Sequence, residues 1–136
     1  MSRITTHILD TALGKPAAGV RVRLERRAIA REPDQLGDPI EAVVQVGLMG
    51  LEDGEPDRWT VVGDSVTDAD GRCRDLVQEA PSGTYRLIFQ AGAYFARTAR
   101  RSIYPEIAIV FDCRGEEHYH LPLLLSDNSY TTYRGS

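Results

Sequence analysis

Cysteine is scarce in this sequence, since Cys73 and Cys113 are the only two among 136 residues. Two cysteines are too few for the disulfide scaffold of a small secreted domain. Neither stands in a metal-ligand or catalytic motif, so we expect both to be reduced thiols that pack as small apolar side chains. The scarcity therefore argues against a fold held together by disulfides or by cysteine-bound metal.

Long apolar runs and an excess of positive charge are also lacking. No run approaches the ~18 residues of a membrane-spanning helix. The formal net charge of −4 argues against nucleic acid or an acidic membrane surface as the main partner. The N-terminus opens into a strand pattern without room for a signal peptide, so we expect a cytoplasmic protein. A local group of arginines is interpreted as a solvated strand edge or subunit contact rather than a polyanion site: Arg21, Arg23, Arg26, Arg27 and Arg31.

The chain instead contains a succession of short alternating patterns. Its 136 residues, 42% of them hydrophobic, suit one domain with a modest core. Side chains alternate between the two faces of a strand, and such alternation recurs at 3–10, 20–25, 59–62, 83–89, 107–113 and 118–125. One helix is expected at 93–102, where Phe95, Ala99 and Ile103 share a face. The pattern predicts an all-β protein, an antiparallel β-sandwich with one short helix.

One block, at about 26–58, interrupts this pattern. It is rich in glycine and proline, and its apolar middle at 40–51 contains glycines that argue against a stable helix. We interpret the block as an inserted loop or hairpin within a single domain spanning 1–136. A long loop in a compact domain usually has a function, so we expect it to pack on a neighbouring subunit or to cover a site.

The last nineteen residues, 118–136, read HYHLPLLLSDNSYTTYRGS. The apolar side chains of the first run share one face, and His118 and His120 share the other. Residues 126–129 are short and polar, which is typical of a turn. The second run, 130–136, is expected to return as the partner strand of a β-hairpin.

This stretch, with its closing Tyr-Arg-Gly-Ser, resembles the transthyretin-related 5-hydroxyisourate hydrolases. The segments HILDTALGKPAAGV at 7–20 and TDADGR at 67–72 resemble the same family. The resemblance implies two four-stranded sheets, assembly as a homotetramer with a central channel, and no cofactor. It implies His7, Arg72 and His120 as catalytic residues. It also implies that Tyr133 and Ser136, together with His7 and Arg72, bind the substrate. Asp127-Asn128 stands where the family usually has Pro-aromatic.

The residue types suit acid–base hydrolysis. One imidazole can accept a proton near neutral pH while a second donates one, and an arginine can stabilise charge on an attacked carbonyl. Two histidines and an arginine make a poor metal site, so none is expected. A calcium loop built around Gly71 would place Val66 and Val77 at both end ligands, which excludes it. No Gly-x-Ser-x-Gly elbow is present.

The resemblance implies two classes of function. The first is hydrolysis of 5-hydroxyisourate, in urate degradation, to 2-oxo-4-hydroxy-4-carboxy-5-ureidoimidazoline by an activated water. The alternative is a non-catalytic carrier that binds a small ligand in the central channel, as the hormone transporters of the family do. A weaker possibility is an inactive member whose channel is blocked by the inserted block.

Overall fold

The computed structural model describes residues 1–28 and 58–135. By its internal contacts the chain divides into one unit of 1–26 with 61–136 and a second of 27–60. The second unit lies almost wholly outside the described residues. The predicted inserted block at about 26–58 therefore stays a prediction.

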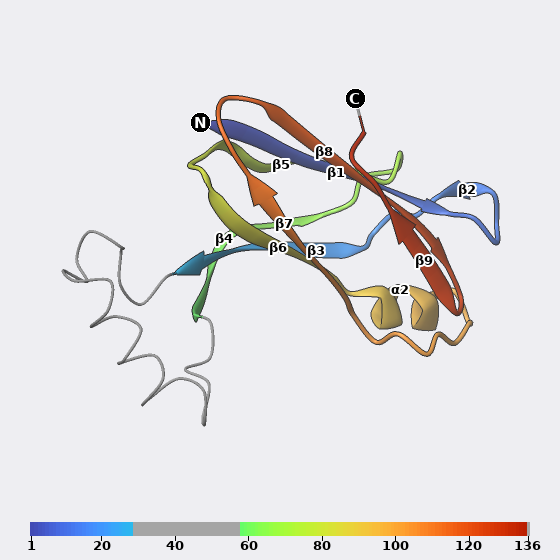
Figure 1. Ribbon diagram of the computed structural model, residues 1–136. Coiled ribbons are helices and arrows are strands. Elements are labelled where there is room, and N and C mark those ends of the chain that lie inside the picture. Colours follow the sequence, from blue (N-terminus) through green and yellow to red (C-terminus); the bar gives the residue numbers. More distant parts are fainter. Residues whose placement is uncertain (29–57, 136) are drawn as a thin grey trace, which may run out of the picture. The chain divides into compact units, whose positions relative to one another are not determined.

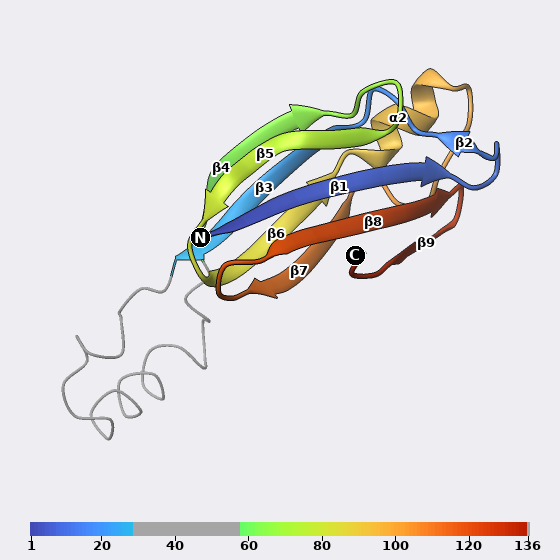
Figure 2. The ribbon, with the colours of Figure 1, turned by 90° about the horizontal axis from the view of Figure 1, so that it is seen from above.

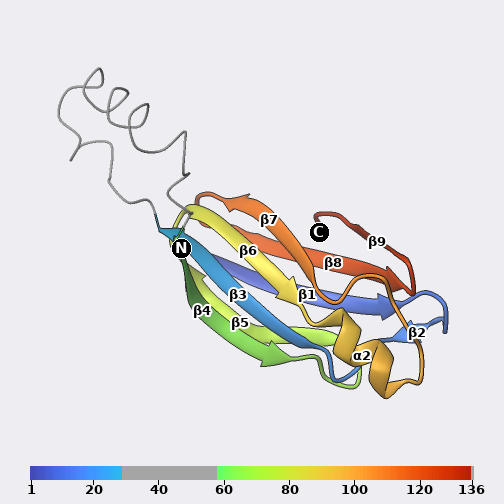
Figure 3. The same ribbon diagram turned by 90° about the horizontal axis from the view of Figure 1, so that it is seen from below.

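Two β-sheets form the described part of the chain (Figure 1). The first sheet has the strand order β2-β1-β8-β9, and β5 pairs with β1. It comprises β1 (Ser2–Asp10), β2 (Lys15–Pro16), β5 (Arg72–Ala80), β8 (His118–Ser126) and β9 (Ser129–Thr132). The second sheet has the order β4-β3-β6-β7, with β3 and β6 in the middle (Figure 3). It comprises β3 (Arg21–Ala28), β4 (Arg58–Val66), β6 (Gly83–Phe89) and β7 (Ile107–Cys113). The predicted all-β sandwich is confirmed. The first sheet has the four predicted strands and, in addition, the two-residue β2.

The core lies between the sheets and is built from the alternate residues that the sequence pattern indicated. Fully buried side chains come from both sheets: Ile4, Ile8, Val22, Leu24, Tyr85, Leu87, Phe89, Leu123 and Leu125. Each side chain of this size stabilises the fold by about 1.5–3 kcal/mol through burial. Both cysteines are free and buried, as expected. Burial raises the pKa of Cys73 to about 11, which keeps its thiol protonated and unreactive.

One strand pair runs parallel, where the sequence pattern had suggested antiparallel pairing throughout. Strands β1 and β8 are parallel neighbours, with Thr5 opposite His120 and His7 opposite Pro122. Figure 2 shows β1 between β5 and β8. Alternation of side chains reveals which face a residue occupies but not the direction of its neighbour, so this pairing was not predictable from periodicity.

The helix is shorter than predicted. The prediction placed it at 93–102, whereas α2 spans Ala91–Arg97. Ala99 adopts a left-handed conformation with φ of 56°, and the Arg100 N–H then donates to the Phe95 carbonyl at 2.8 Å. This geometry ends a helix by satisfying its last carbonyl groups. Phe95 is buried, but Ile103 lies beyond the helix and is 66% exposed, so the predicted helix face shared by these two residues does not form.

A buried carboxylate joins the end of β1 to the segment after α2. Asp10 is completely buried, accepts a 2.7 Å hydrogen bond from the Tyr94 hydroxyl, and is paired with Arg100. Arg100 also donates to Asp127 in the β8–β9 turn at 3.2 Å. Burial alone would raise the pKa of Asp10, but hydrogen bonds from Arg100, Tyr94 and the Leu13 N–H together hold it below its ordinary value. The network fixes the hairpin turn to the body of the domain.

Replacing Asp10 with alanine is expected to lower the free energy of unfolding by about 3 kcal/mol, because it leaves Arg100 without its buried partner. Asp127→Ala is the matched control: it removes the exposed partner of the same arginine and should cost under about 1 kcal/mol. Denaturant unfolding at pH 7 measures both. Because the pKa of Asp10 is lowered on folding, its contribution is full above about pH 4 and disappears as the pH falls further. Equal losses in the two variants would contradict this account.

Candidate functional site

The three predicted catalytic residues lie on one face of the first sheet. His7 on β1 is directly opposite Arg72 on β5, and Thr5, two residues from His7, is directly opposite His120 on β8. Residues opposite one another on paired strands point to the same face, as do residues two apart on one strand. This face is opposite the one that carries Ile4 and Ile8 into the core. The sheet register therefore brings together residues that are far apart in sequence.

The turn before β5 fixes the start of that strand, where Arg72 lies. The Asp68 carboxylate accepts hydrogen bonds from the Asp70 and Arg72 N–H groups at 2.9 and 3.0 Å. Gly71 has φ of +77°, and a Cβ there would stand 2.3 Å from the Ile8 carbonyl oxygen. Only glycine permits this approach, which lets the Ile8 N–H donate to the Gly71 carbonyl at 2.7 Å. The turn therefore ties Arg72 to the strand of His7.

His7 contacts the same turn through its ring. Its Nε2 lies 2.8 Å from the Asp70 carbonyl oxygen. A carbonyl can only accept, so Nε2 carries the hydrogen and the neutral ring has its lone pair on Nδ1. The main chain of the turn therefore selects one tautomer of His7.

His120 is half-buried and surrounded by positive charge. Its Nδ1 lies 2.8 Å from the Thr5 hydroxyl. Burial, followed by the nearby Arg72, His118 and His7, lowers the pKa of His120 below the ordinary 6.5. The ring is consequently neutral at pH 7 and able to accept a proton.

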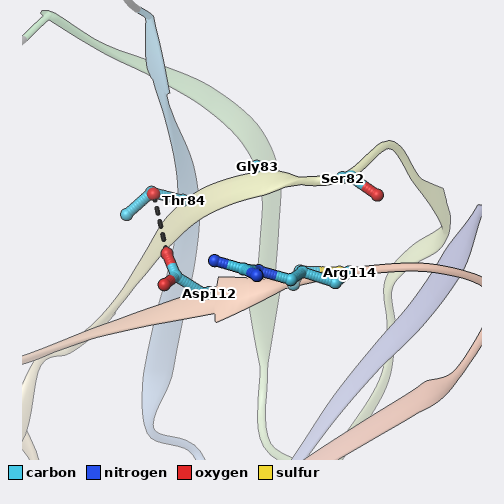
Figure 4. Close-up of a pocket in the computed structure, with 6 residues that line it drawn as sticks. Ser82, Gly83, Thr84, Asp112 and Arg114 are labelled. Carbon is cyan, nitrogen blue, oxygen red and sulfur yellow. Dashed lines mark hydrogen bonds between the residues drawn. The ribbon is translucent and has the colours of Figure 1, made fainter.

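A cavity of about 180 Å³ lies over these side chains, lined by Arg3, Thr5, Thr6, Arg72, Arg74, His118 and His120. Three arginines and two histidines make it suited to a small, oxygen-rich molecule that carries or develops negative charge. His7 is not among the lining residues. A larger cavity of about 450 Å³ lies elsewhere, over the ends of β6 and β7 (Figure 4). Its Asp112 accepts a hydrogen bond from Thr84 at 2.9 Å, and none of the predicted site residues lines it, so we assign the site to the smaller cavity.

The C-terminal segment approaches His120, although the strand is shorter than predicted. The second strand of the hairpin, expected at 130–136, ends at Thr132. The register nevertheless persists, since the Gly135 N–H donates to the His120 carbonyl at 2.7 Å. Continuing that register places Tyr133 opposite Pro122, which has no N–H to donate, and this accounts for the interruption.

By the same register, the Tyr133 side chain lies on the face of the sheet that carries the site. This side chain is 53% exposed. A Cβ on Gly135 would stand 2.8 Å from His120 Cδ2, so the main chain at Gly135 packs closely against that ring. Ser136, the other predicted contact in this segment, lies outside the described residues. The substrate-binding roles of both residues stay predictions.

The prediction from sequence omitted several residues that line the cavity, above all Thr5 and His118. The Thr5 hydroxyl lies 2.7 Å from His118 Nε2 as well as 2.8 Å from His120 Nδ1. The signal was present: both residues are two positions from a predicted site residue and so share its face.

Within 1–28 and 58–135, no group of three or more His, Cys, Asp or Glu side chains gathers as metal ligands. In the same described ranges, no helix has the length and apolarity needed to cross a membrane.

The two-sheet sandwich with an arginine–histidine site on one sheet defines a transthyretin-like protein. Residues 4–135 match the model of the HIUase/Transthyretin family, and the chain belongs to that family. A mouse 5-hydroxyisourate hydrolase is 38% identical over 138 residues, covering 99% of this chain and 96% of the mouse protein.

Solved structures of two kinds are similar to this chain. The structure of Klebsiella pneumoniae 5-hydroxyisourate hydrolase matches with a TM-score of 0.71 and 34% identity, covering 100% of both chains. Sea bream transthyretin in complex with thyroxine matches with a TM-score of 0.74 and 28% identity, covering 98% of this chain and 94% of that one. Both an enzyme and a hormone-binding protein share the fold, so the site residues must distinguish the two classes.

Proposed function

We propose that this protein is a 5-hydroxyisourate hydrolase of urate degradation. The observation that carries the proposal is the register that aligns His7, Arg72 and His120 on one sheet face. The similarity of the mouse and Klebsiella hydrolases over nearly the whole chain supports it. The arginines and histidines that line the cavity of about 180 Å³ suit an oxygen-rich substrate that develops negative charge.

In the proposed reaction, Arg72 holds the oxygen of the carbonyl under attack and stabilises its developing negative charge. His120, neutral at pH 7, takes a proton from the attacking water through Nε2. The water oxygen bonds to the carbonyl carbon, the ring C–N bond breaks, and the leaving nitrogen receives the second proton of the attacking water, which leaves a carboxylate. The product is the carboxylated ureidoimidazoline. His7, with its tautomer fixed by Asp70, orients the substrate together with Tyr133 and Ser136.

The proposal includes assembly and location. The catalytic face of the first sheet lies on the side away from the core of its own chain, so copies stacked on it would form a channel that is lined by the sites and open to solvent at its ends. We therefore include the homotetramer with its central channel in the proposal, together with the cytoplasmic location expected from the sequence. Neither nucleic acid nor membrane is proposed as a partner.

The test is the ultraviolet absorbance of freshly generated 5-hydroxyisourate with and without the purified protein, alongside a thyroxine-binding titration. Accelerated decay is expected, with no saturable thyroxine binding. Unchanged decay combined with saturable thyroxine binding would instead establish the carrier function seen in the sea bream complex. The absence of both activities would leave the third class, an inactive family member with a blocked channel.

A further inference from the structure

The Thr5 hydroxyl bridges two histidine rings. It is 2.7 Å from His118 Nε2 and 2.8 Å from His120 Nδ1, and Thr5 is only 4% exposed. His118 is exposed and His120 is half-buried, and both line the cavity. The parallel register of β1 and β8 creates this bridge, because it sets Thr5 opposite His120 and Arg3 opposite His118. The result is an unbroken line of polar atoms from the half-buried His120 ring to the exposed His118 ring.

A hydroxyl has one hydrogen to donate, which constrains both rings. If Thr5 donates to His118 Nε2, its oxygen accepts the Nδ1–H of His120. His120 Nε2 then carries the lone pair that a general base needs. If Thr5 donates to His120 instead, His120 Nε2 carries a hydrogen and the ring cannot act as a base through that atom.

The charges around His120 favour moving a proton away from it. The groups that face it are Arg72 and Arg74 from β5, Arg3 and His7 from β1, and His118 from β8. The residues lining the cavity include no carboxylate to stabilise an imidazolium. Ring opening also yields a carboxylic acid that ionises at neutral pH, so one proton must leave the site in each turnover.

We propose that His118 and Thr5 form a proton relay that holds His120 in its Nδ1–H tautomer and carries the proton released in each turnover to solvent. This inference rests on the proposed function, but the tautomer can be measured without substrate. As His120 Nε2 takes the proton from water, its Nδ1–H proton passes to Thr5 Oγ1. The original Thr5 hydroxyl proton passes to His118 Nε2, and the exposed His118 ring releases a proton to solvent. His120 is then protonated on Nε2, and the starting tautomer returns after product release, when Nε2 gives its proton to solvent water and a proton comes back from His118 through Thr5 to Nδ1. Thr5 and His118 are thus positioning and relay residues.

The first test is the tautomer of His120 in the full-length protein, read from nitrogen-15 chemical shifts at about pH 8. The relay predicts a protonated Nδ1 and an unprotonated Nε2, and a loss of this preference in Thr5→Val. A wild-type His120 protonated on Nε2 would overturn the proposal, whatever the substrate of the enzyme proves to be.

The second test uses turnover. Thr5→Val removes the hydroxyl, and His118→Gln keeps a hydrogen-bonding side chain that cannot take up a proton. Both are expected to lower kcat about tenfold with KM within about twofold, and added imidazole buffer should restore much of the loss by carrying the proton directly. Thr5→Ser, which retains the hydroxyl, should stay within about twofold of wild type. The relay is overturned if Thr5→Val and His118→Gln both turn over normally. It is also overturned if both are slow and imidazole buffer fails to restore their turnover.

Discussion

Arg72→Ala is expected to lower kcat/KM for 5-hydroxyisourate by about 10²–10³-fold while leaving the fold intact. In the proposed mechanism Arg72 supplies the hydrogen bonds that stabilise the attacked carbonyl oxygen, and removal of one such donor typically has an effect of this size. The fold should tolerate the change because the turn is held by the Asp68 carboxylate, which accepts from the Arg72 N–H, and by the Gly71 N–H, which donates to the Asp68 carbonyl, and not by the Arg72 side chain. Steady-state kinetics with thermal unfolding of the same samples measures both effects.

Two further substitutions sharpen that measurement. Arg72→Lys keeps the charge but loses the planar fork, so it should recover only part of the activity. Arg21→Ala is the control, because it removes an exposed arginine that pairs with Asp64 on the second sheet. Its kcat/KM should match wild type. If Arg72→Ala also retained the wild-type value, the carbonyl-stabilising role of Arg72 would be contradicted.

Gly135→Ala is expected to lower kcat about 10²-fold, although it adds a single methyl group outside the reacting atoms. That methyl would stand 2.8 Å from His120 Cδ2, with the His120 carbonyl and Pro122 both 3.4 Å away. The His120 ring must therefore shift, which breaks its 2.8 Å contact with Thr5 or moves Nε2 from the water it activates. A displacement of about 1 Å at a reacting group can lower the rate by about this factor.

Ser129→Ala, at the start of β9, serves as the control for Gly135→Ala. Ser129 lies at the far end of the β8–β9 hairpin from Gly135, so its loss should leave kcat unchanged. Circular dichroism and the oligomeric state of both variants should equal those of wild type. Normal turnover by Gly135→Ala would show that the close approach of the C-terminal segment has no part in positioning His120.

The sequence was informative wherever one face of a strand is apolar. Alternation identified the buried residues of β1, β3, β6 and β8, because burial imposes a period of two on them. It also placed His7 and His120 on faces opposite the core. The terminal strand was overextended because Pro122 interrupts the ladder opposite Tyr133, an effect of pairing that one strand alone does not reveal.

The parts that the sequence missed depend on contacts between distant segments. The left-handed turn at Ala99 ended α2 before Ile103, where local periodicity suggested continuation. The bridge from Thr5 to two histidines depends on parallel pairing of β1 and β8, for which alternation gives no direction. Thr5 alone would be interpreted as an ordinary strand residue. Its role in the relay can be recognised only from the two histidines that it contacts.

The decay of freshly generated 5-hydroxyisourate at pH 7, with equal concentrations of wild type and His120→Ala, tests the central claim most directly. The claim is that this chain hydrolyses the ring and that His120 is the base. The account predicts that the wild type removes the absorbance at least about 10²-fold faster than the variant, whose trace should approach that of buffer alone. Indistinguishable decay with the two proteins would contradict it.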